Sequence, residues 1–205
     1  MLAALRLYTR HVRFSRGRGL FVRAIEQLKR RGWPPPRTPI GLGLEMEFEP
    51  SLLGWTTFER GEWEPQQTEL VLRLLPPGAV VLNVGANTGY YALLMAATVA
   101  STGGHVHAFE IQPDVADILR RNVVHNGLQN HVSVVERGCY SSVGDAAIEI
   151  PGDPGSARIS FGSRGNRVPL TTLDRYADDV GLPRVDFVFV DAEGADLEVL
   201  RGASD

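Results

Sequence analysis

The feature that most constrains the fold is an apolar run that ends in a glycine-spaced turn, at residues 80–89 (VVLNVGANTG). Gly85 and Gly89 let the backbone turn tightly and leave no Cβ in the way of a ligand. Residues 90–100 are apolar nearly throughout, as expected of a helix that lies on a sheet. The pattern predicts the strand, turn and helix with which α/β folds hold a nucleotide-like cofactor. Steric demands alone also place glycine in such turns, so the turn by itself leaves both interpretations open.

A second apolar run, residues 105–110 (HVHAFE), ends in a carboxylate, and Glu110 lies 21 positions after Gly89. In a doubly wound sheet, an acid at the carboxyl end of the second strand accepts hydrogen bonds from ribose hydroxyls. Nicotinamide enzymes use Gly-x-Gly-x-x-Gly, whereas here Asn87 replaces the second glycine and no third glycine follows. A cofactor with a ribose but no phosphates, such as S-adenosylmethionine, therefore fits the turn better than a dinucleotide.

Further blocks follow in the chain, namely Tyr90-Tyr91, Asn122 and Asn126, Leu173-Asp174, and Asp191-Ala192-Glu193-Gly194. In order and spacing, these blocks together with the turn and Glu110 resemble the FkbM-type family of class I methyltransferases, over about residues 78–202. The resemblance implies a Rossmann-like α/β fold with a mainly parallel, doubly wound sheet and S-adenosylmethionine as cofactor. It also implies O-methylation of a hydroxyl on a sugar or other small metabolite.

The resemblance further implies where the site lies. The predicted cofactor-binding residues are Asn83, Gly85, Ala86, Asn87, Thr88, Gly89, Glu110, Ile111, Gly138 and Asp191. Asp191 and Glu193 are the predicted catalytic residues, because methyl transfer needs an aligned acceptor oxygen and, where necessary, a base. Their alternative role is to cap a short helix that begins near Ala195. Two oxygen-bearing side chains are too few to predict a metal site.

The chain departs from the family pattern in two places. Asn83 stands where an aspartate is usual, and Phe189-Val190-Asp191 stands where Lys-Ile-Asp is usual, while the only lysine is Lys29. These changes favour an alternative function, a non-catalytic S-adenosylmethionine-binding remnant or half of a split enzyme. A complete class I sheet needs three further strands, so we expect the last strands to be missing. The apolar edge of residues 185–190 would then be open to a partner.

Composition limits the class of protein. A chain of 205 residues with 43% hydrophobic residues and a net charge of -3 can bury one core plus an appendage. No stretch is long and apolar enough to span a bilayer. The single cysteine, Cys139, excludes an internal disulfide framework and is predicted to be buried, in keeping with a cytoplasmic protein. The expected partner is a small hydroxylated acceptor and not a nucleic acid.

Residues 1–63 are predicted to be a lead-in to a methyltransferase core at residues 64–205. Residues 1–32 hold nine Arg or Lys against one acid, and residues 19–31 form a predicted amphipathic helix. That helix either covers the cofactor side or lies on an anionic membrane or a partner. Residues 38–64 are predicted to form short strands and turns, in which Leu44, Met46 and Phe48 alternate with Glu45, Glu47 and Glu49. Three aromatic side chains either line a substrate pocket or pack on the sheet, namely Trp55, Phe58 and Trp63.

Signals in the remaining sequence predict helices at residues 65–75 and 113–127 and strands at residues 132–136 and 185–190. Asn122 and Asn126 share one helix face and are interpreted as solvated unless the family match gives them a role. Residues 141–166 are predicted to form a hairpin and a loop over the site. Three arginines in or directly after this segment either contact an acidic or phosphorylated substrate or are solvated, namely Arg158, Arg164 and Arg167.

Overall fold

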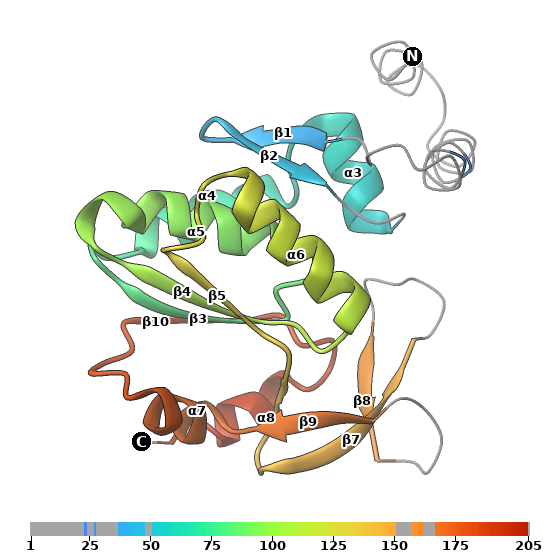
Figure 1. The fold of residues 1–205 in the computed structure, drawn as a ribbon, viewed down its shortest axis with the longest axis vertical. Helices are drawn as coiled ribbons and strands as arrows, with labels where there is room; N and C mark the ends of the chain where they lie inside the picture. The colour runs from blue at the N-terminus through green and yellow to red at the C-terminus, as the bar shows by residue number, and fades with distance from the viewer. Residues whose placement is uncertain are drawn as a thin grey trace.

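The computed structural model describes Arg23, Gln27 and residues 37–47, 51–150, 157–161 and 167–204. Its centre is a parallel sheet of four strands in the order β10-β3-β4-β5 (Figure 1). The strands are β3 (Val80–Val84), β4 (His105–Phe109), β5 (Val132–Val135) and β10 (Phe187–Val190). They coincide with the four predicted strands, and the predicted α/β fold is confirmed. Because all four run in parallel, their carboxyl ends meet at one edge of the sheet.

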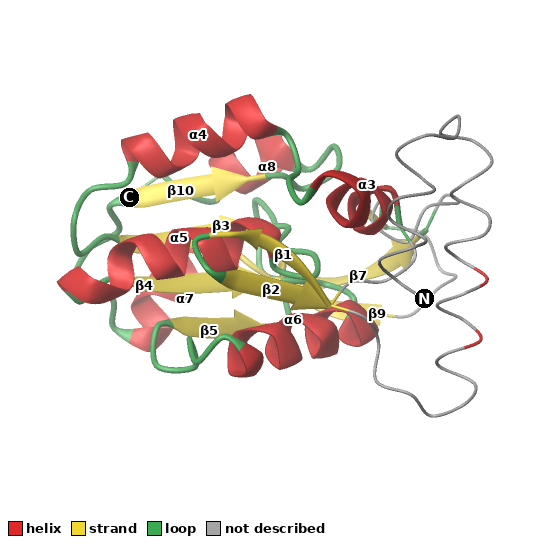
Figure 2. Cartoon of the chain, turned by 90° about the horizontal axis from the view of Figure 1, so that it is seen from above, coloured by secondary structure: helices red, strands yellow, loops and turns green. Residues whose placement is uncertain are grey.

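One face of this sheet is covered by α4 (Pro65–Leu74), α5 (Tyr90–Val99) and α6 (Pro113–His125) (Figures 1 and 2). A hairpin of β1 (Arg37–Gly41) and β2 (Leu44–Glu47), followed by α3 (Leu52–Arg60), lies over these helices. The hairpin buries Ile40, Leu44 and Met46 in the same hydrophobic cluster as Val81 and Leu93. Helix α5 is therefore covered by the sheet on one side and by the hairpin on the other, which explains its apolar character.

Two asparagine side chains of α6 bind the backbone of β2. Asn122 Oδ1 accepts the Glu47 N–H at 2.7 Å, and Asn122 Nδ2 donates to the carbonyls of Glu47 at 2.6 Å and Thr88 at 2.8 Å. Asn126 accepts the N–H of Glu45 at 2.9 Å and donates to its carbonyl at 2.7 Å. Four residues of a helix advance by about 6 Å and two residues of a strand by about 6.7 Å, so the two spacings match. The interpretation of these amides as solvated is wrong, because they pair with the edge of β2.

Glu47 does not face outward, as its place in the alternating pattern of residues 44–49 would imply. Its side chain is 2% exposed, and its carboxylate forms an ion pair with the guanidinium of Arg121 of α6 at 2.6 Å. Packing of α6 against both β2 and the sheet places this alternate residue inside the protein. Phe48 and Glu49 lie outside the described residues, as does the helix predicted at residues 19–31 apart from Arg23 and Gln27. The boundary between residues 63 and 64 stays a prediction.

The second face of the parallel sheet packs against α7 (Leu173–Val180), α8 (Asp196–Arg201) and a small second sheet (Figure 1). The small sheet has the order β6-β9-β7-β8, with β6 (Gly138–Cys139), β7 (Gly144–Glu149), β8 (Arg158–Ser160) and β9 (Arg167–Thr171). The antiparallel pair β7–β8 confirms the predicted hairpin. Strand β9, which pairs with β6 and β7, was not predicted, because it is short and contains a proline. Arg164 lies outside the described residues.

Strand β10 forms one edge of the parallel sheet in the part of the chain that the structure describes. Val185 and Val188 at this edge are 37% and 38% exposed. Among the described helices, none is long and apolar enough to cross a membrane.

Candidate functional site

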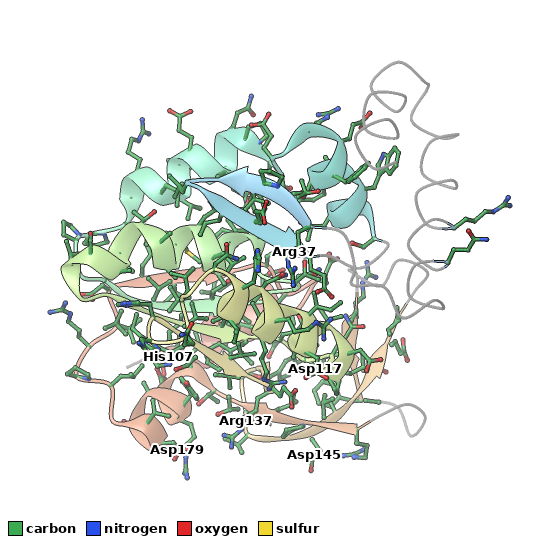
Figure 3. The ribbon with its side chains drawn as sticks, turned by 45° about the horizontal axis from the view of Figure 1, so that its top comes forward. Arg37, His107, Asp117, Arg137, Asp145 and Asp179 are labelled. Atoms are coloured by element: carbon green, nitrogen blue, oxygen red, sulfur yellow. The ribbon has the colours of Figure 1, made fainter. Side chains whose placement is uncertain are left out.

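A cavity of about 530 Å³ opens at the carboxyl edge of the parallel sheet. Four segments that follow strands line it, namely residues 84–87 after β3, residues 109–112 after β4, residues 137–139 after β5, and residues 191–193 after β10. The strand order fixes their order in space, with Asp191 at one end, Glu110 in the middle and Gly138 at the other end. Arg137 belongs to the Gly138 end and lies on the side of the small sheet (Figure 3).

The turn after β3 uses all five of its own backbone N–H groups inside the protein. Gly85 and Ala86 donate to the Phe109 carbonyl at 3.1 and 2.8 Å, and Asn87 donates to the Glu110 carboxylate at 2.9 Å. The N–H groups of Thr88 and Gly89 donate within the turn, to Asn87 Oδ1 and to the Ala86 carbonyl. A pyrophosphate needs free N–H groups at such a turn. The geometry therefore agrees with a cofactor that has no phosphates.

Packing alone accounts for both glycines of the turn. Gly85 has φ +78°, and a Cβ there would collide with the carbonyl oxygen of Asp191 where β3 and β10 end side by side. Gly89 has φ +106°, and a Cβ there would collide with Leu119 of α6. Asn87 adopts φ +51°, which asparagine tolerates better than most residues. The steric interpretation of the glycines thus holds, and the identity of the ligand must rest on other groups.

Glu110 is the group that points most directly to a ligand. Its side chain is only 5% exposed, yet it lines the cavity. One carboxylate oxygen accepts the Asn87 N–H at 2.9 Å and the other accepts the Gln112 N–H at 2.8 Å. Burial raises the pKa of Glu110 to about 7, against the opposing effect of these backbone donors. The Ile111 N–H also stabilises the carboxylate, and because a carboxylate has about four acceptor positions, roughly one or two remain for donors from the cavity. Such a group fits the two hydroxyls of a ribose.

The predicted cofactor residues separate into two groups. Seven of them line the cavity, namely Gly85, Ala86, Asn87, Glu110, Ile111, Gly138 and Asp191. Thr88, Gly89 and Asn83 lie behind the wall, and both polar atoms of the fully buried Asn83 amide lack a hydrogen-bond partner. Asn83 sits in register with Ala108 and Phe189 within the sheet. An unpaired buried amide is costly, so Asn83 weakens this position instead of reinforcing it.

Asp191 and Glu193 both line the far end of the cavity. Partial burial raises the pKa of Asp191, and the carboxylates of Glu193, Glu64 and Asp196 raise it further. Neither of the two predicted catalytic residues caps α8, because Ala195 is the N-cap and makes no side-chain cap bond. The Asp196 carboxylate instead accepts the Ala192 N–H at 2.9 Å. Both predicted catalytic carboxylates are therefore left on the cavity wall.

An aromatic wall faces these carboxylates, and most of it was not predicted. Trp63, Tyr90 and Tyr91 line the cavity together with Leu53, whereas Trp55 and Phe58 are buried in the core. The Tyr91 ring packs on Phe189 with centroids 4.5 Å apart. The helix that follows a ligand-binding turn starts beside the ligand, and this position was the available signal for Tyr90 and Tyr91.

Cys139 is buried, as predicted, and desolvation raises the pKa of its thiol. It contributes to the cavity wall at the Gly138 end. Within the described ranges, no grouping of three or more His, Cys, Asp or Glu side chains is arranged to hold a metal ion.

Comparison with known proteins gives a family. Residues 83–205 match the profile of the methyltransferase FkbM domain. The methyltransferase sdnD of Sordaria araneosa is 29% identical over 164 residues, which cover 64% of this chain and 62% of that protein. The hexuronic acid methyltransferase AglP of Haloferax volcanii is 31% identical over 137 residues, covering 64% and 54%. A protein-L-isoaspartate O-methyltransferase of Hyperthermus butylicus is 33% identical over 107 residues, covering 49% and 42%.

The chain thus spans between 42% and 62% of the length of these relatives. Among solved structures, it is similar to the methyltransferase FkbM of Methylobacillus flagellatus, with a TM-score of 0.44 and 14% identity. That match covers 73% of this chain and 38% of the other.

Proposed function

The chain belongs to the FkbM methyltransferase family, and on that premise we propose that it transfers a methyl group from S-adenosylmethionine to a hydroxyl of a sugar or other small metabolite. Family membership implies the cofactor. The main observation in support of this position for the cofactor is the buried Glu110 carboxylate. It keeps acceptor positions free beside a turn whose N–H groups are all used within the protein, so none is left for phosphates.

The strand order supports one orientation of the cofactor. With the ribose hydroxyls on Glu110, the adenine extends toward Ile111 and Gly138, and the methionine part extends over Gly85 toward Asp191. Asn83, Thr88 and Gly89 then act from behind the wall by holding the shape of the turn. Bound in this way, S-adenosylmethionine supplies an electrophilic methyl group at the Asp191 end.

Asp191 is the proposed proton acceptor. The acceptor oxygen forms its bond to the methyl carbon as the carbon–sulfur bond breaks, and the hydroxyl proton passes to the Asp191 carboxylate. The raised pKa of Asp191 makes it a stronger base than an ordinary aspartate. The proposed role of Glu193, which lines the cavity on the turn that follows, is to hold the acceptor hydroxyl in line.

The test is transfer of a labelled methyl group to a panel of hydroxylated acceptors, with the product identified by mass spectrometry. We expect Asp191→Asn to lower the rate by about 100-fold while leaving S-adenosylhomocysteine affinity nearly unchanged. Asp178→Asn, which changes an exposed aspartate on α7, is the matched control and should have no effect.

A non-catalytic cofactor-binding role is the second candidate. It is favoured by Asn83, whose neutral and unpaired amide leaves no negative charge at this point of the sheet. In that case the chain, alone or with a partner along the β10 edge, binds S-adenosylhomocysteine without turnover of any acceptor. Normal cofactor binding with no methyl transfer across the panel would select this candidate and contradict the first.

A further inference from the structure

The end of the cavity beyond Asp191 is built by a segment far away in sequence. Leu53 of α3 and Trp63 of the α3–α4 connection line the same cavity as Asp191 and Glu193. Tyr91 at the start of α5 lines the same end and packs on Phe189 of β10. If the cofactor occupies the space between Gly138 and Gly85, this end is the part of the cavity where an acceptor meets the methyl group. The connection between α3 and α4 is therefore part of the acceptor wall.

Glu64 is fixed at this wall by its backbone and its side chain. It is the N-cap residue of α4, with φ +43° and ψ +63°, immediately before Pro65. This left-handed conformation is unfavourable for a residue other than glycine, and more so before proline. The Tyr91 hydroxyl donates to Glu64 Oε2 at 3.1 Å. The charge of Glu64 also contributes to the raised pKa of Asp191.

Charge separates the two ends of the cavity. Asp191 and Glu193 carry negative charge on the cavity wall at the acceptor end, and Glu64, an exposed residue bonded to the lining residue Tyr91, adds a third negative charge next to the wall. The basic side chain among the described lining residues is Arg137, which belongs to the opposite end. Arg158 is not among the lining residues, whereas its neighbours Ala157, just before β8, and Ile159, within β8, are, in keeping with the alternation of side chains along a strand. A carboxylate or phosphate on the acceptor would meet repulsion at this end.

The same end has the shape and polarity for a polyhydroxyl ring. Trp63, Tyr90 and Tyr91 offer flat apolar surfaces, while the carboxylates opposite them accept hydrogen bonds from hydroxyl or ammonium groups. Ligand sites commonly combine an apolar lining with a few convergent polar groups. An anionic acceptor could use the aromatic surface but not the carboxylates.

We propose that the α3–α4 connection forms the acceptor subsite and that Glu64 is its specificity-determining residue, selecting a neutral or amino-bearing sugar over an anionic one. This inference rests on the proposed function, because it assigns an acceptor to the methyl-transfer site. It also distinguishes this chain from the hexuronic acid methyltransferase that it resembles.

The test compares glucose with glucosamine, which carries an amine in place of the C2 hydroxyl, and with glucuronate, which carries a carboxylate at C6. Ligand-observed NMR measures their binding to the protein saturated with S-adenosylhomocysteine. We expect glucosamine to bind at least about tenfold more tightly than glucuronate, with glucose in between, because the three carboxylates attract the ammonium group of glucosamine and repel the carboxylate of glucuronate. In Glu64→Gln this ratio should fall to about threefold or less, because the variant removes one of the repelling charges.

Glu69→Gln, which removes an exposed carboxylate from α4, is the charge-matched control and should leave the ratio unchanged. Glucuronate binding as tightly as glucosamine, or the same ratio in Glu64→Gln as in the unchanged protein, would overturn the acceptor assignment alone. The affinity for S-adenosylhomocysteine, measured by calorimetry in every variant, separates this result from failure of the proposed function. A folded protein that does not bind S-adenosylhomocysteine would overturn both.

Discussion

The two ends of the cavity are built in different ways. At the end that we propose for the cofactor, backbone groups of the β3 turn and the strand ends bond to one another and to Glu110, so main-chain geometry fixes this part of the cavity. At the end that we propose for the acceptor, side chains from α3, the α3–α4 connection, α5 and the turn after β10 line the cavity, and Tyr91 is bonded to Glu64 of the connection. The cofactor end is therefore fixed by the fold itself. The acceptor end is set by individual side chains that can be exchanged without rebuilding the sheet.

The largest expected effect tests whether backbone packing fixes the cofactor end. In Gly85→Ala the new Cβ meets the Asp191 carbonyl, so β3 or β10 must shift. We expect the free energy of unfolding to fall by about 3 kcal/mol or more, measured by urea denaturation. Gly103→Ala is the control, because it also has a positive φ but open space around its Cβ position, and it should cost only about 1 kcal/mol. Equal losses in the two variants would show that the close approach of β10 is unimportant.

A second change tests whether the lead-in hairpin supports the cofactor turn. Asn122→Ala removes three buried hydrogen bonds and leaves the Glu47 backbone and the Thr88 carbonyl unpaired. We expect a loss of about 2–3 kcal/mol in unfolding free energy. Asn126→Ala acts on the more exposed Glu45 and should cost about 1 kcal/mol. A larger loss at Asn126 would contradict the role of Asn122 as the link to the turn.

The third prediction concerns the pH dependence of the cofactor end. Ribose hydroxyls donate to an ionised carboxylate, and the pKa of Glu110 is raised to about 7. Affinity should therefore be full above pH 7 and decline as the pH falls below it. At pH 6 about a tenth of Glu110 is ionised, so S-adenosylhomocysteine should bind roughly tenfold more weakly than at pH 8 by calorimetry. Glu110→Gln should bind weakly at both pH values, and an unchanged pH slope in this variant would assign the titration to another group.

The smallest effect belongs to the acceptor end. Tyr91→Phe keeps the ring that packs on Phe189 and removes the hydrogen bond to Glu64. We expect the acceptor KM to rise about threefold to fivefold, because the variant loses one hydrogen bond to a charged group and the acceptor end is then held less firmly. Steady-state kinetics with labelled cofactor measure this change. A comparable loss of S-adenosylhomocysteine affinity would contradict the separation of the two ends.

This difference between the ends also explains what the sequence could predict. The four strands of the parallel sheet were each predicted from a short contiguous signal, at residues 80–84, 105–110, 132–136 and 185–190, and the edge that holds the cavity follows from their carboxyl ends. The sequence offered Trp63 only as one of three aromatic candidates, and Tyr90 and Tyr91 only by their place after the turn. It gave no signal for Glu64, whose partner Tyr91 lies 27 positions further along the chain.

Some local signals were also misread because their partners lie far away in sequence. Asn122 has the spacing of a solvated helix face, and only β2 beside it reveals its role. Asn83 stands where the family usually has an aspartate, but the sequence could not show that its amide lies behind the cavity wall without a partner.

The most direct test is calorimetric titration of the protein with S-adenosylhomocysteine at pH 8, beside Glu110→Ala checked for folding by circular dichroism. The placement of the ribose on Glu110 predicts micromolar binding that weakens by about 100-fold in the variant, because hydrogen bonds to a buried charge are lost. Equal affinity in both proteins would contradict it and remove Glu110 from the cofactor site.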